Sequence, residues 1–374
     1  MVLKNVCFYN EVFEKEVGDI RIENGKFTEI GIINDPGEDK SGLIALPGFV
    51  DVHIHGCGGA DACDCSENAL HTMANTLAKQ GVTSFCPTTM TLPVEKLEKI
   101  AAAVADFKQK QTKGSKIAGI NFEGPFIAMA KKGAQNGDYV VPGTKKDFDA
   151  LYNASKGLMK LITVAPEAFD SDEFIKYASQ KCNISVGHSC ANGAECQKAV
   201  DLGVNHATHL YNAMTAMTHR EPGIVGTCLD NNSVMCEIIC DGAHVCPAVL
   251  RNTFKILGED RAVVISDSMR GAGLGAGEFE LGGQQVFVDE NGRYARLADG
   301  TIAASISNVF NEFKNLLEFG IDFKTALKSC TINPAKSINA ENEIGSVALG
   351  KQADLVFVDS QLNIKEVIIN GIYA

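Results

Sequence analysis

The sequence contains no tryptophan and no CxxC pair, and no run of apolar residues approaches the ~18 that a transmembrane helix needs. Its 13 cysteines are odd in number and scattered, which argues against both a zinc ribbon and a secreted disulfide scaffold. The first residues include acids where a signal peptide needs an apolar core. We therefore expect a cytoplasmic protein with reduced thiols and no membrane segment.

Basic residues are also scarce, because 34 Lys and Arg stand against 46 Asp and Glu and give a formal charge of −12. This balance argues against nucleic acid or an anionic membrane as the main partner, since phosphate backbones require a basic face. It does not exclude a small anionic substrate, because two or three donors can hold one phosphate. With 374 residues, 45% of them hydrophobic and 21% charged, the chain is typical of a globular protein with a large core.

The middle of the chain alternates short apolar, β-branched runs with stretches of helical pattern. The eight runs are Leu46–Val52, Val82–Pro87, Ile117–Phe122, Leu161–Ala165, Ile184–Val186, Ala207–Leu210, Val234–Ile239 and Ala262–Ile265. One clear helix is expected from Asn192, with Glu195 at the capping-box position, to a stop at Gly203. This alternation predicts an α/β fold with a parallel (β/α)8 TIM-like barrel, and an open doubly wound sheet is the alternative.

Both ends of the chain have a β-rich pattern that differs from the middle. Val17 to Ile33 is typical of a hairpin with an Asn24-Gly25 turn, and the segments Ala353–Val358 and Glu366–Ile369 repeat this pattern near the C-terminus. We therefore expect a small β-sandwich domain formed from both chain ends, residues 1–45 plus 340–374. The barrel would occupy residues 46–339.

Polar side chains follow five of the eight predicted strands. They are His53 and His55, Glu123, His188, His209 and Asp267. The spacings of 68 residues from His55 to Glu123 and 65 from Glu123 to His188 each fit two βα units, and the 21 residues from His188 to His209 fit one. In a closed barrel the carboxyl ends of the strands form one rim, where active sites lie. The six side chains converge only if the barrel closes, which favours the barrel over the open sheet.

His53 and His55 are two apart on a strand, so both imidazoles point to the same face. With carboxylates nearby they suit a borderline divalent ion such as Zn²⁺ or Fe²⁺. The remaining histidines are expected to be structural (His71, His206) or in a loop (His219). The glycine-rich segment 271–277 is followed by strand-like residues rather than a helix, so we interpret it as a rim loop and not a nucleotide-binding loop.

A series of motifs in order from residue 47 to 269 resembles a known family. The motifs are PGFVDVHIHGCGG, NFEGPF, GHS, HLYNAM, HREPG, DGAHV and ISDSM, and NPAKSINAENEIGSVALGKQADLVFVD follows them. The opening motif is similar to that of the amidohydrolase superfamily, and the series as a whole resembles its N-acetylglucosamine-6-phosphate deacetylase family. The resemblance implies hydrolysis of the acetamide of a phosphorylated amino sugar, in amino-sugar catabolism or cell-wall sugar recycling, by a cytoplasmic homodimer that uses metal-activated water.

The resemblance also implies a metal site. Its principal ligands would be Glu123, His188 and His209, and His53 and His55 would complete a second site with Glu123 bridging and Asp267 nearby. One or two divalent ions per subunit are therefore expected, with Zn²⁺ favoured and Fe²⁺ as the alternative. The fourth strand is followed by residues 164–167, Val-Ala-Pro-Glu, without the lysine of the hydantoinase and dihydroorotase branch.

The substrate contacts implied by the resemblance come from four segments. They are Ala134, Gln135, Asn212, Ala213, Arg220, Asp241, His244, Ile302, Ala303 and Ala304. Arg220 and His244 would hold the phosphate, and Arg220 is a candidate to act across a dimer interface; the alternative is that Arg220 only pairs with Glu221. Some family members have His where this chain has Gln135, which can still donate a hydrogen bond to a substrate carbonyl but cannot titrate, so an acid–base role is excluded there.

Asp267 is the predicted catalytic residue, which takes a proton from the attacking water and delivers it to the departing amine. The alternative is that Asp267 serves only as a metal ligand. Two other functions remain open: a deacetylase of another N-acetyl hexosamine phosphate, such as N-acetylgalactosamine 6-phosphate, and a barrel that binds ligands without catalysis.

Overall fold

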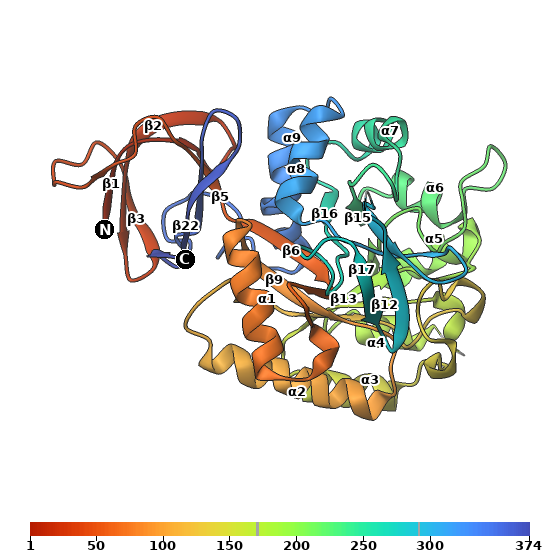
Figure 1. Cartoon of the computed structure of the whole chain (residues 1–374). Coiled ribbons are helices and arrows are strands. Elements are labelled where there is room, and N and C mark those ends of the chain that lie inside the picture. The colour runs from red at the N-terminus through yellow and green to blue at the C-terminus, as the bar shows by residue number, and fades with distance from the viewer. Residues whose placement is uncertain (170–171, 291) are drawn as a thin grey trace.

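The computed structural model of the protein describes residues 1–169, 172–290 and 292–374. Its larger lobe is built around eight parallel strands, and the strands of the chain ends lie beside it (Figure 1). In chain order the eight parallel strands are β6 (Phe49–Ile54), β9 (Val82–Thr89), β11 (Ile120–Glu123), β12 (Met159–Val164), β13 (Asn183–Val186), β14 (Val204–Ala207), β15 (Met235–Ile239) and β16 (Ala262–Ile265). Each strand pairs in parallel with the next one in this order. A two-residue strand, β10 (Lys116–Ile117), adds to β9.

The first and last strands of this series meet, so the sheet closes into a barrel. Just beyond β16, the backbone N–H of Asp267 donates to the carbonyl of His53 at 2.9 Å. The N–H of His55 donates in return to the carbonyl of Ser268, also at 2.9 Å. These bonds confirm the (β/α)8 barrel predicted from the sequence rather than the open sheet.

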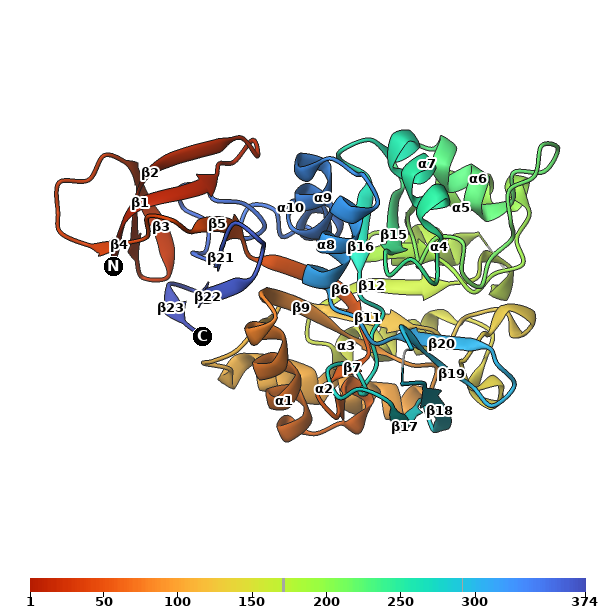
Figure 2. The same ribbon diagram turned by 45° about the horizontal axis from the view of Figure 1, so that its top comes forward.

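Helices follow the strands and surround the barrel (Figure 2). They are α1 (Glu67–Lys79), α2 (Val94–Lys110), α3 (Lys145–Ala154), α4 (Glu173–Ala178), α5 (Gly193–Leu202), α6 (Gly223–Asp230), α7 (Pro247–Leu257), α8 (Val309–Glu318), α9 (Phe323–Cys330) and α10 (Ile332–Ser337). The largest apolar cluster joins strand residues such as Ile162 and Val264 to helix residues such as Leu97 and Leu250. β6, β9, β11 and β16 are buried along their whole length, and each of the other four strands has one partly exposed residue, because helices cover the barrel.

The predicted helix and five of the eight predicted strand positions agree closely with the structure. The first predicted strand, Leu46–Val52, spans the end of β5 (Ile44–Pro47) and most of β6, and the third, Ile117–Phe122, spans the end of β10 and most of β11. Asn192 caps α5, Glu195 completes the capping box and Gly203 ends the helix. The sixth strand was predicted at Ala207–Leu210 but runs from Val204 to Ala207. The prediction was displaced there because an apolar segment continues past the strand into a turn.

Strands from both ends of the chain form one eight-stranded sheet. They are β1 (Val2–Tyr9), β2 (Lys15–Glu23), β3 (Lys26–Gly31), β4 (Glu38–Asp39), β5 (Ile44–Pro47), β21 (Leu355–Val358), β22 (Ile364–Ile369) and β23 (Ile372–Tyr373). β21 pairs antiparallel with β5, and both termini lie on this side of the molecule (Figure 1). In the β2–β3 hairpin, Asn24 and Gly25 have φ of 50° and 75°, the two positive angles that a tight type I′ turn requires.

This sheet has an apolar cluster of its own, formed by residues such as Leu3, Phe8, Ile20, Leu355 and Ile368. A separate core is what an independent small domain needs. This cluster supports a small domain at the chain ends, although Val356, Val358 and Ile369 of the same sheet pack in the barrel cluster. The domain boundaries at residues 45 and 340 stay a prediction.

A smaller four-stranded antiparallel sheet is inserted between β16 and α8. It consists of β17 (Gly277–Leu281), β18 (Gln284–Val288), β19 (Tyr294–Arg296) and β20 (Ile302–Ser305). The glycine-rich segment 271–277 leads into β17 and no helix follows it, as predicted. A short hairpin, β7 (Gly56–Cys57) with β8 (Ala60–Asp61), follows β6.

All 13 cysteines are free thiols, and seven of them are buried. None of the helices within the described ranges combines the length and the apolar composition of a membrane span.

Candidate metal and substrate site

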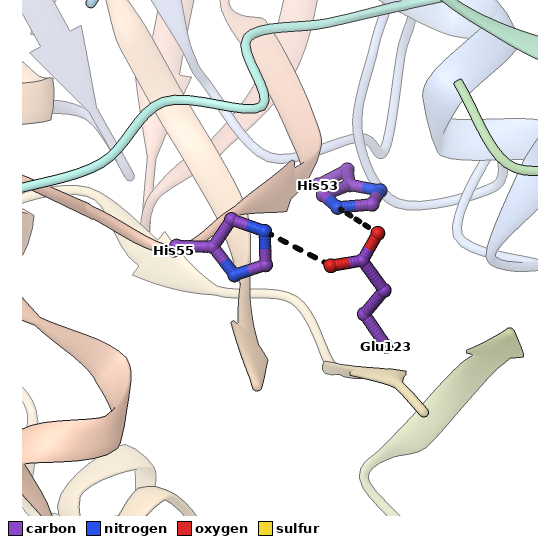
Figure 3. Close-up of side chains that lie close together, drawn as sticks. All are labelled: His53, His55 and Glu123. Carbon is purple, nitrogen blue, oxygen red and sulfur yellow. Dashed lines mark ion pairs between the residues drawn. The ribbon is translucent and has the colours of Figure 1, made fainter. Parts of the chain in front are cut away.

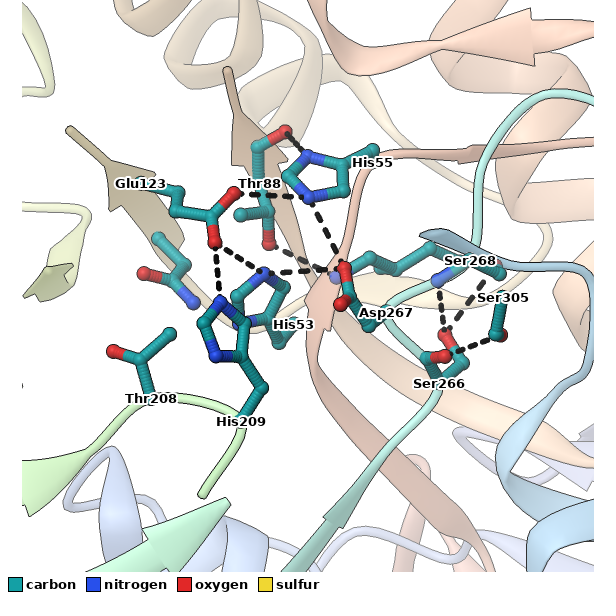
Figure 4. A network of polar contacts seen from close by, with 12 residues as sticks. His53, His55, Thr88, Glu123, Thr208, His209, Ser266, Asp267, Ser268 and Ser305 are labelled. Atoms are coloured by element: carbon teal, nitrogen blue, oxygen red, sulfur yellow. Dashed lines mark hydrogen bonds and ion pairs between the residues drawn. The ribbon is translucent and has the colours of Figure 1, made fainter. Parts of the chain in front are cut away.

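The polar residues predicted from the strand ends converge at the mouth of the barrel (Figure 4). His53 lies on β6 with His55 just beyond it, and Glu123 is the last residue of β11. His188, His209 and Asp267 each lie two residues beyond the end of β13, β14 and β16. All three have a positive φ, of 48°, 30° and 46°, a left-handed conformation that is rare outside glycine.

Glu123 is the centre of the first cluster. Its Oε1 lies 3.0 Å from Nε2 of His188 and 2.9 Å from Nε2 of His209, and the two Nε2 atoms are 3.1 Å apart. All three side chains are buried. Two ligands of one tetrahedral ion, each at ~2.1 Å from it, lie about 3.4 Å apart. The observed spacing is therefore close to that of three ligands around one divalent ion.

His53 and His55 form a second cluster with the same carboxylate (Figure 3). Nε2 of His55 is 3.2 Å from Glu123 Oε2, and Nε2 of His53 is 3.8 Å from Glu123 Oε1. Oδ1 of Asp267 lies 3.2 Å from Nε2 of His55 and 3.6 Å from Nε2 of His53. Glu123 is thus placed to bridge the two clusters, and Asp267 lies beside the second.

Each group in the site changes the charge state of the others. Burial opposes ionisation of Glu123, but hydrogen bonds from His188, His209 and His55 outweigh it and hold the pKa of Glu123 well below its usual range. The same balance lowers the pKa of Asp267, where burial is outweighed by His53 and His55. Burial lowers the pKa of His53, but Glu237, Asp267 and Glu123 together raise it to about 9. The site therefore favours bound positive charge.

The donor atoms of the site fit a divalent ion. Three imidazoles hold their Nδ1 against a protein acceptor: His53 with Glu237 Oε2 at 2.9 Å, His55 with the Thr88 carbonyl at 3.3 Å and His188 with the Lys131 carbonyl at 2.7 Å. An Nδ1–H donor leaves the Nε2 lone pair free for a metal. Among the described residues, the buried Nε2 of His53 has no hydrogen-bond partner. A cation between these atoms would give it one.

A cavity of about 300 Å³ opens directly above these clusters. This volume is at the lower end of the range of about 300–1,000 Å³ that is typical of small-molecule binding sites. Seven of the ten substrate-contact residues implied by the resemblance line it: Ala134, Gln135, Asn212, Ala213, His244, Ile302 and Ala303. His55, Glu123, His188, His209 and Asp267 form its inner wall, so the metal-ligand candidates and the sugar-contact candidates face one space.

The other three candidates do not line the cavity in the part of the chain that the structure describes. Asp241 lies behind His244, with its Oδ2 2.7 Å from His244 Nδ1 and its Oδ1 accepting the His244 N–H. Ala304 is fully buried next to Ala303. Asp241 therefore orients His244 rather than facing the cavity itself.

Arg220 lies in an exposed loop outside the cavity, and His219 is in the same loop as predicted. The alternative that Arg220 pairs with Glu221 finds no support within the described residues, because Glu221 Oε1 instead accepts the N–H groups of Gly193 and Gly223. A single copy of the chain therefore leaves the Arg220 guanidinium away from the cavity.

The side-chain amide of Gln135 was expected to donate to a carbonyl of the substrate, but it bonds to other protein groups instead. Its Nε2 donates to Glu123 Oε2 at 2.5 Å, and its Oε1 accepts the Thr91 N–H at 2.6 Å. Gln135 therefore lines the cavity and also holds the carboxylate that joins the two clusters.

Glu237 lies on β15 with 1% of its surface exposed and was not predicted as a site residue. Its signal in the sequence was one charged residue inside the apolar run MCEIIC. Met90, Lys131 and Thr301 also line the cavity and were not predicted, although Lys131 and Thr301 belong to the segments that contain the predicted Ala134 and Ile302.

Comparison with known proteins agrees with this geometry. The profile of the amidohydrolase family matches residues 44–372. The chain is 34% identical to N-acetylglucosamine-6-phosphate deacetylase of Bacillus subtilis, covering 99% of this chain and 96% of that one. It is 30% identical to N-acetylgalactosamine-6-phosphate deacetylase of Escherichia coli O157:H7, over 94% and 93%. A variant of the deacetylase of Mycobacterium smegmatis, solved in complex with N-acetyl-D-glucosamine-6-phosphate, superposes with a TM-score of 0.92 at 25% identity, over 100% and 98%.

Proposed function

The chain belongs to the amidohydrolase family, and from this we propose that it hydrolyses the acetamide of N-acetyl-D-glucosamine 6-phosphate to D-glucosamine 6-phosphate and acetate, a step of amino-sugar catabolism. The observation that carries this proposal is the Glu123 carboxylate, which faces imidazoles from both clusters, beside Asp267 and at the inner wall of the cavity. Amide hydrolysis needs an activated water and a proton donor for the amine, and this wall provides side chains for both.

Glu123, His188 and His209 would hold the principal divalent ion, and His53, His55 and Glu123 would hold a second. We propose Zn²⁺, with Fe²⁺ as the alternative, because imidazole and carboxylate ligands suit both. When bound, such an ion lowers the pKa of water and polarises a carbonyl oxygen. The tautomers described above point the Nε2 atoms of His53, His55 and His188 towards the places that the ions would occupy.

We propose that Asp267 moves the proton. Its carboxylate is buried and kept ionised by His53 and His55, so it can accept the proton of the water that attacks the acetyl carbon. The new C–O bond forms as the proton moves to Asp267. When the C–N bond breaks, Asp267 returns the proton to the sugar nitrogen, which is too basic to leave as an anion.

The rest of the cavity positions the sugar. Asn212, Ala213, Gln135 and His244 line it away from the ion clusters, and Asp241 holds the His244 ring in one orientation. An imidazole next to a carboxylate is a good donor to a phosphate oxygen. Binding the phosphate at the far end of the sugar would place the acetamide at Asp267 and the histidines.

A second candidate substrate is N-acetylgalactosamine 6-phosphate, because the Escherichia coli relative named for that activity is 30% identical. The two sugars differ in one hydroxyl epimer. The testing experiment is acetate release from both phosphorylated sugars and from unphosphorylated N-acetylglucosamine. We expect the highest kcat/KM with N-acetylglucosamine 6-phosphate. Preference for the galactosamine epimer would reassign the substrate, and no acetate release from any sugar by metal-loaded protein would favour the non-catalytic alternative.

We further propose a cytoplasmic homodimer in which Arg220 reaches the cavity of the partner. The exposed position of Arg220 outside the cavity of its own subunit supports a role across the interface. The 13 free thiols support a cytoplasmic location. Mixing Arg220→Ala and Asp267→Asn subunits tests it. If Arg220 acts across the interface, one site of each mixed dimer has both residues and activity returns. If the mixture is no more active than its components, Arg220 acts elsewhere.

A further inference from the structure

Glu237 occupies an unusual position for a carboxylate. It projects from the middle of β15 into the barrel beneath the metal-ligand candidates, and 1% of its surface is exposed. Burying a charge is costly unless it is paired, so its interactions require an explanation. His53 and His206 are the two imidazoles beside it, at 2.9 Å from Oε2 and 3.3 Å from Oε1. Glu237 does not line the cavity, so it does not meet the substrate.

The contact with His53 differs from those of the other imidazoles. His55 and His188 direct Nδ1 at neutral backbone carbonyls, whereas Nδ1 of His53 meets a carboxylate. A carboxylate partner fixes the ring orientation, keeps the proton on Nδ1 and makes Nε2 a stronger ligand. That Nε2 is buried and has no hydrogen-bond partner within the described ranges, and it points at Glu123 and Asp267 (Figure 4).

Glu237 also holds the element that carries a ligand of the other cluster. Its Oε2 accepts the backbone N–H of His209 at 3.3 Å, and its own carbonyl accepts the N–H of Leu210 at 2.8 Å. These bonds brace the turn in which His209 takes its left-handed φ of 30°. One carboxylate oxygen is therefore shared between the ring of His53 and the backbone of His209.

We propose that Glu237 is a positioning residue that pre-organises the His53–His55–Glu123 cluster as a second metal site and couples it to the His188–His209 cluster. The inference rests on the proposed metal-dependent function and adds the residue that makes the second site bind. Glu237 acts mainly on His53, through a side-chain bond of 2.9 Å, and more weakly on His209, through a backbone bond of 3.3 Å.

The test measures metal affinity rather than activity. Zn²⁺ is titrated into metal-free protein against a chromophoric chelator, for the wild type and for Glu237→Gln, Glu237→Ala and His53→Ala. The wild type is expected to bind two ions, and His53→Ala identifies the one that belongs to the second cluster. Glu237→Gln keeps an acceptor for Nδ1–H but loses the charge, so affinity for that ion should fall about 10- to 100-fold, with the principal ion less affected. Glu237→Ala should lose more.

A matched control is Glu312→Gln. Glu312 is also a fully buried glutamate, on α8, and neither of its carboxylate oxygens has a hydrogen-bond partner in the described part of the chain. The same isosteric change there should leave both zinc affinities unchanged. Thermal unfolding of the metal-free proteins separates a loss of folding from a loss of binding.

Three outcomes would overturn the proposal. Glu237→Gln could bind both zinc ions with wild-type affinity, it could lose the same affinity for both ions, or Glu312→Gln could lose as much zinc affinity as Glu237→Gln. A wild type that binds one ion at saturation would also overturn it, since there would be no second site to organise. None of these outcomes depends on the substrate, so acetate release still tests the proposed deacetylase function separately.

Discussion

Three residues at the mouth of the barrel, His188, His209 and Asp267, adopt the left-handed backbone region although none is glycine. Each such residue costs about 1–2 kcal/mol, and this strain persists where the surrounding structure enforces it. For Asp267 the enforcing bonds are its N–H to the His53 carbonyl and its carbonyl to the Ser305 N–H, at 2.9 and 2.8 Å. This backbone conformation directs the side chains of His188 and His209 to Glu123, and that of Asp267 to His53 and His55.

Asp267→Asn should leave this backbone arrangement intact while removing the proton acceptor. We expect kcat to fall by at least ~10²-fold, the usual size of a general acid–base contribution, because an amide cannot take the proton of water. Metal content by elemental analysis and the thermal midpoint should stay close to wild type. Near-normal turnover would show that Asp267 is only a ligand.

Arg220→Ala separates the phosphate from the rest of the substrate. A guanidinium can give two charge-assisted bonds to phosphate, each worth about 1.5–3 kcal/mol. The kcat/KM for the phosphorylated sugar should therefore fall roughly 10²-fold or more. The kcat/KM for unphosphorylated N-acetylglucosamine should change little, because this sugar has no phosphate for Arg220 to hold.

The matched control for that variant is Arg21→Ala, which removes an arginine from the sheet of the chain ends, where it pairs with Glu29 and Asp35. Arg21→Ala should leave kcat/KM unchanged for both the phosphorylated and the unphosphorylated sugar. If Arg220→Ala lowers kcat/KM by the same factor for both sugars, Arg220 supports the fold and other residues hold the phosphate.

At the residue scale, the sequence could predict side chains whose spacing matches the strands, but not residues that act through another side chain. The positions of His53, His55, Glu123 and Asp267 match the ends of the predicted strands, so it could be predicted that these side chains come together. Glu237 was missed because periodicity alone does not show which residue a buried carboxylate will meet across the barrel.

At the scale of elements, the eight strands and the helix α5 were predicted because their signals are local: apolar runs for the strands, and a capping box and a glycine stop for the helix. The displaced strand shows the limit. Leu210 is buried and continues the apolar run, but His209, Tyr211 and Ala213 all have positive φ, so the chain is turning there. These angles depend on bonds to β15, such as that from Leu210 N–H to the Glu237 carbonyl.

The strand ends also predict how the metal ligands divide. His188 and His209 follow β13 and β14 and form one cluster, whereas His53 lies on β6 and belongs to the other. His188→Ala and His209→Ala should each remove the principal ion, while His53→Ala should remove only the second, so metal content by elemental analysis should fall unequally. His71→Ala, on the exposed side of α1, is the control and should bind as wild type. Equal losses from the three ligand variants would mean a single site.

At the scale of the whole molecule, the two ends of the chain meet in one sheet that continues directly into the barrel. β5 pairs with β21 and is followed at once by β6, which carries His53. Across this junction, Lys116 Nζ lies 2.5 Å from Asp354 Oδ2, a buried carboxylate 238 residues away in the sequence. The sequence predicted that the two β-rich ends form one small domain, but side-chain partners so far apart carry no local signal, so this ion pair could not be predicted.

The candidate ligands join five segments of the barrel, from β6 to the end of β16, so metal binding should stabilise the fold as a whole. Without an ion, the favourable contacts of these buried imidazoles and carboxylates depend on shared protons. A ligand that binds only the folded state raises the free energy of unfolding by about 2.7 kcal/mol when its free concentration is 100 times its Kd. Chelation should therefore lower the thermal midpoint measured by calorimetry, and the midpoint should rise with added Zn²⁺. A double variant, His188→Ala with His209→Ala, should show a much smaller shift, because it lacks the principal site. If chelator and zinc leave the wild-type midpoint unchanged, these side chains do not bind a divalent ion.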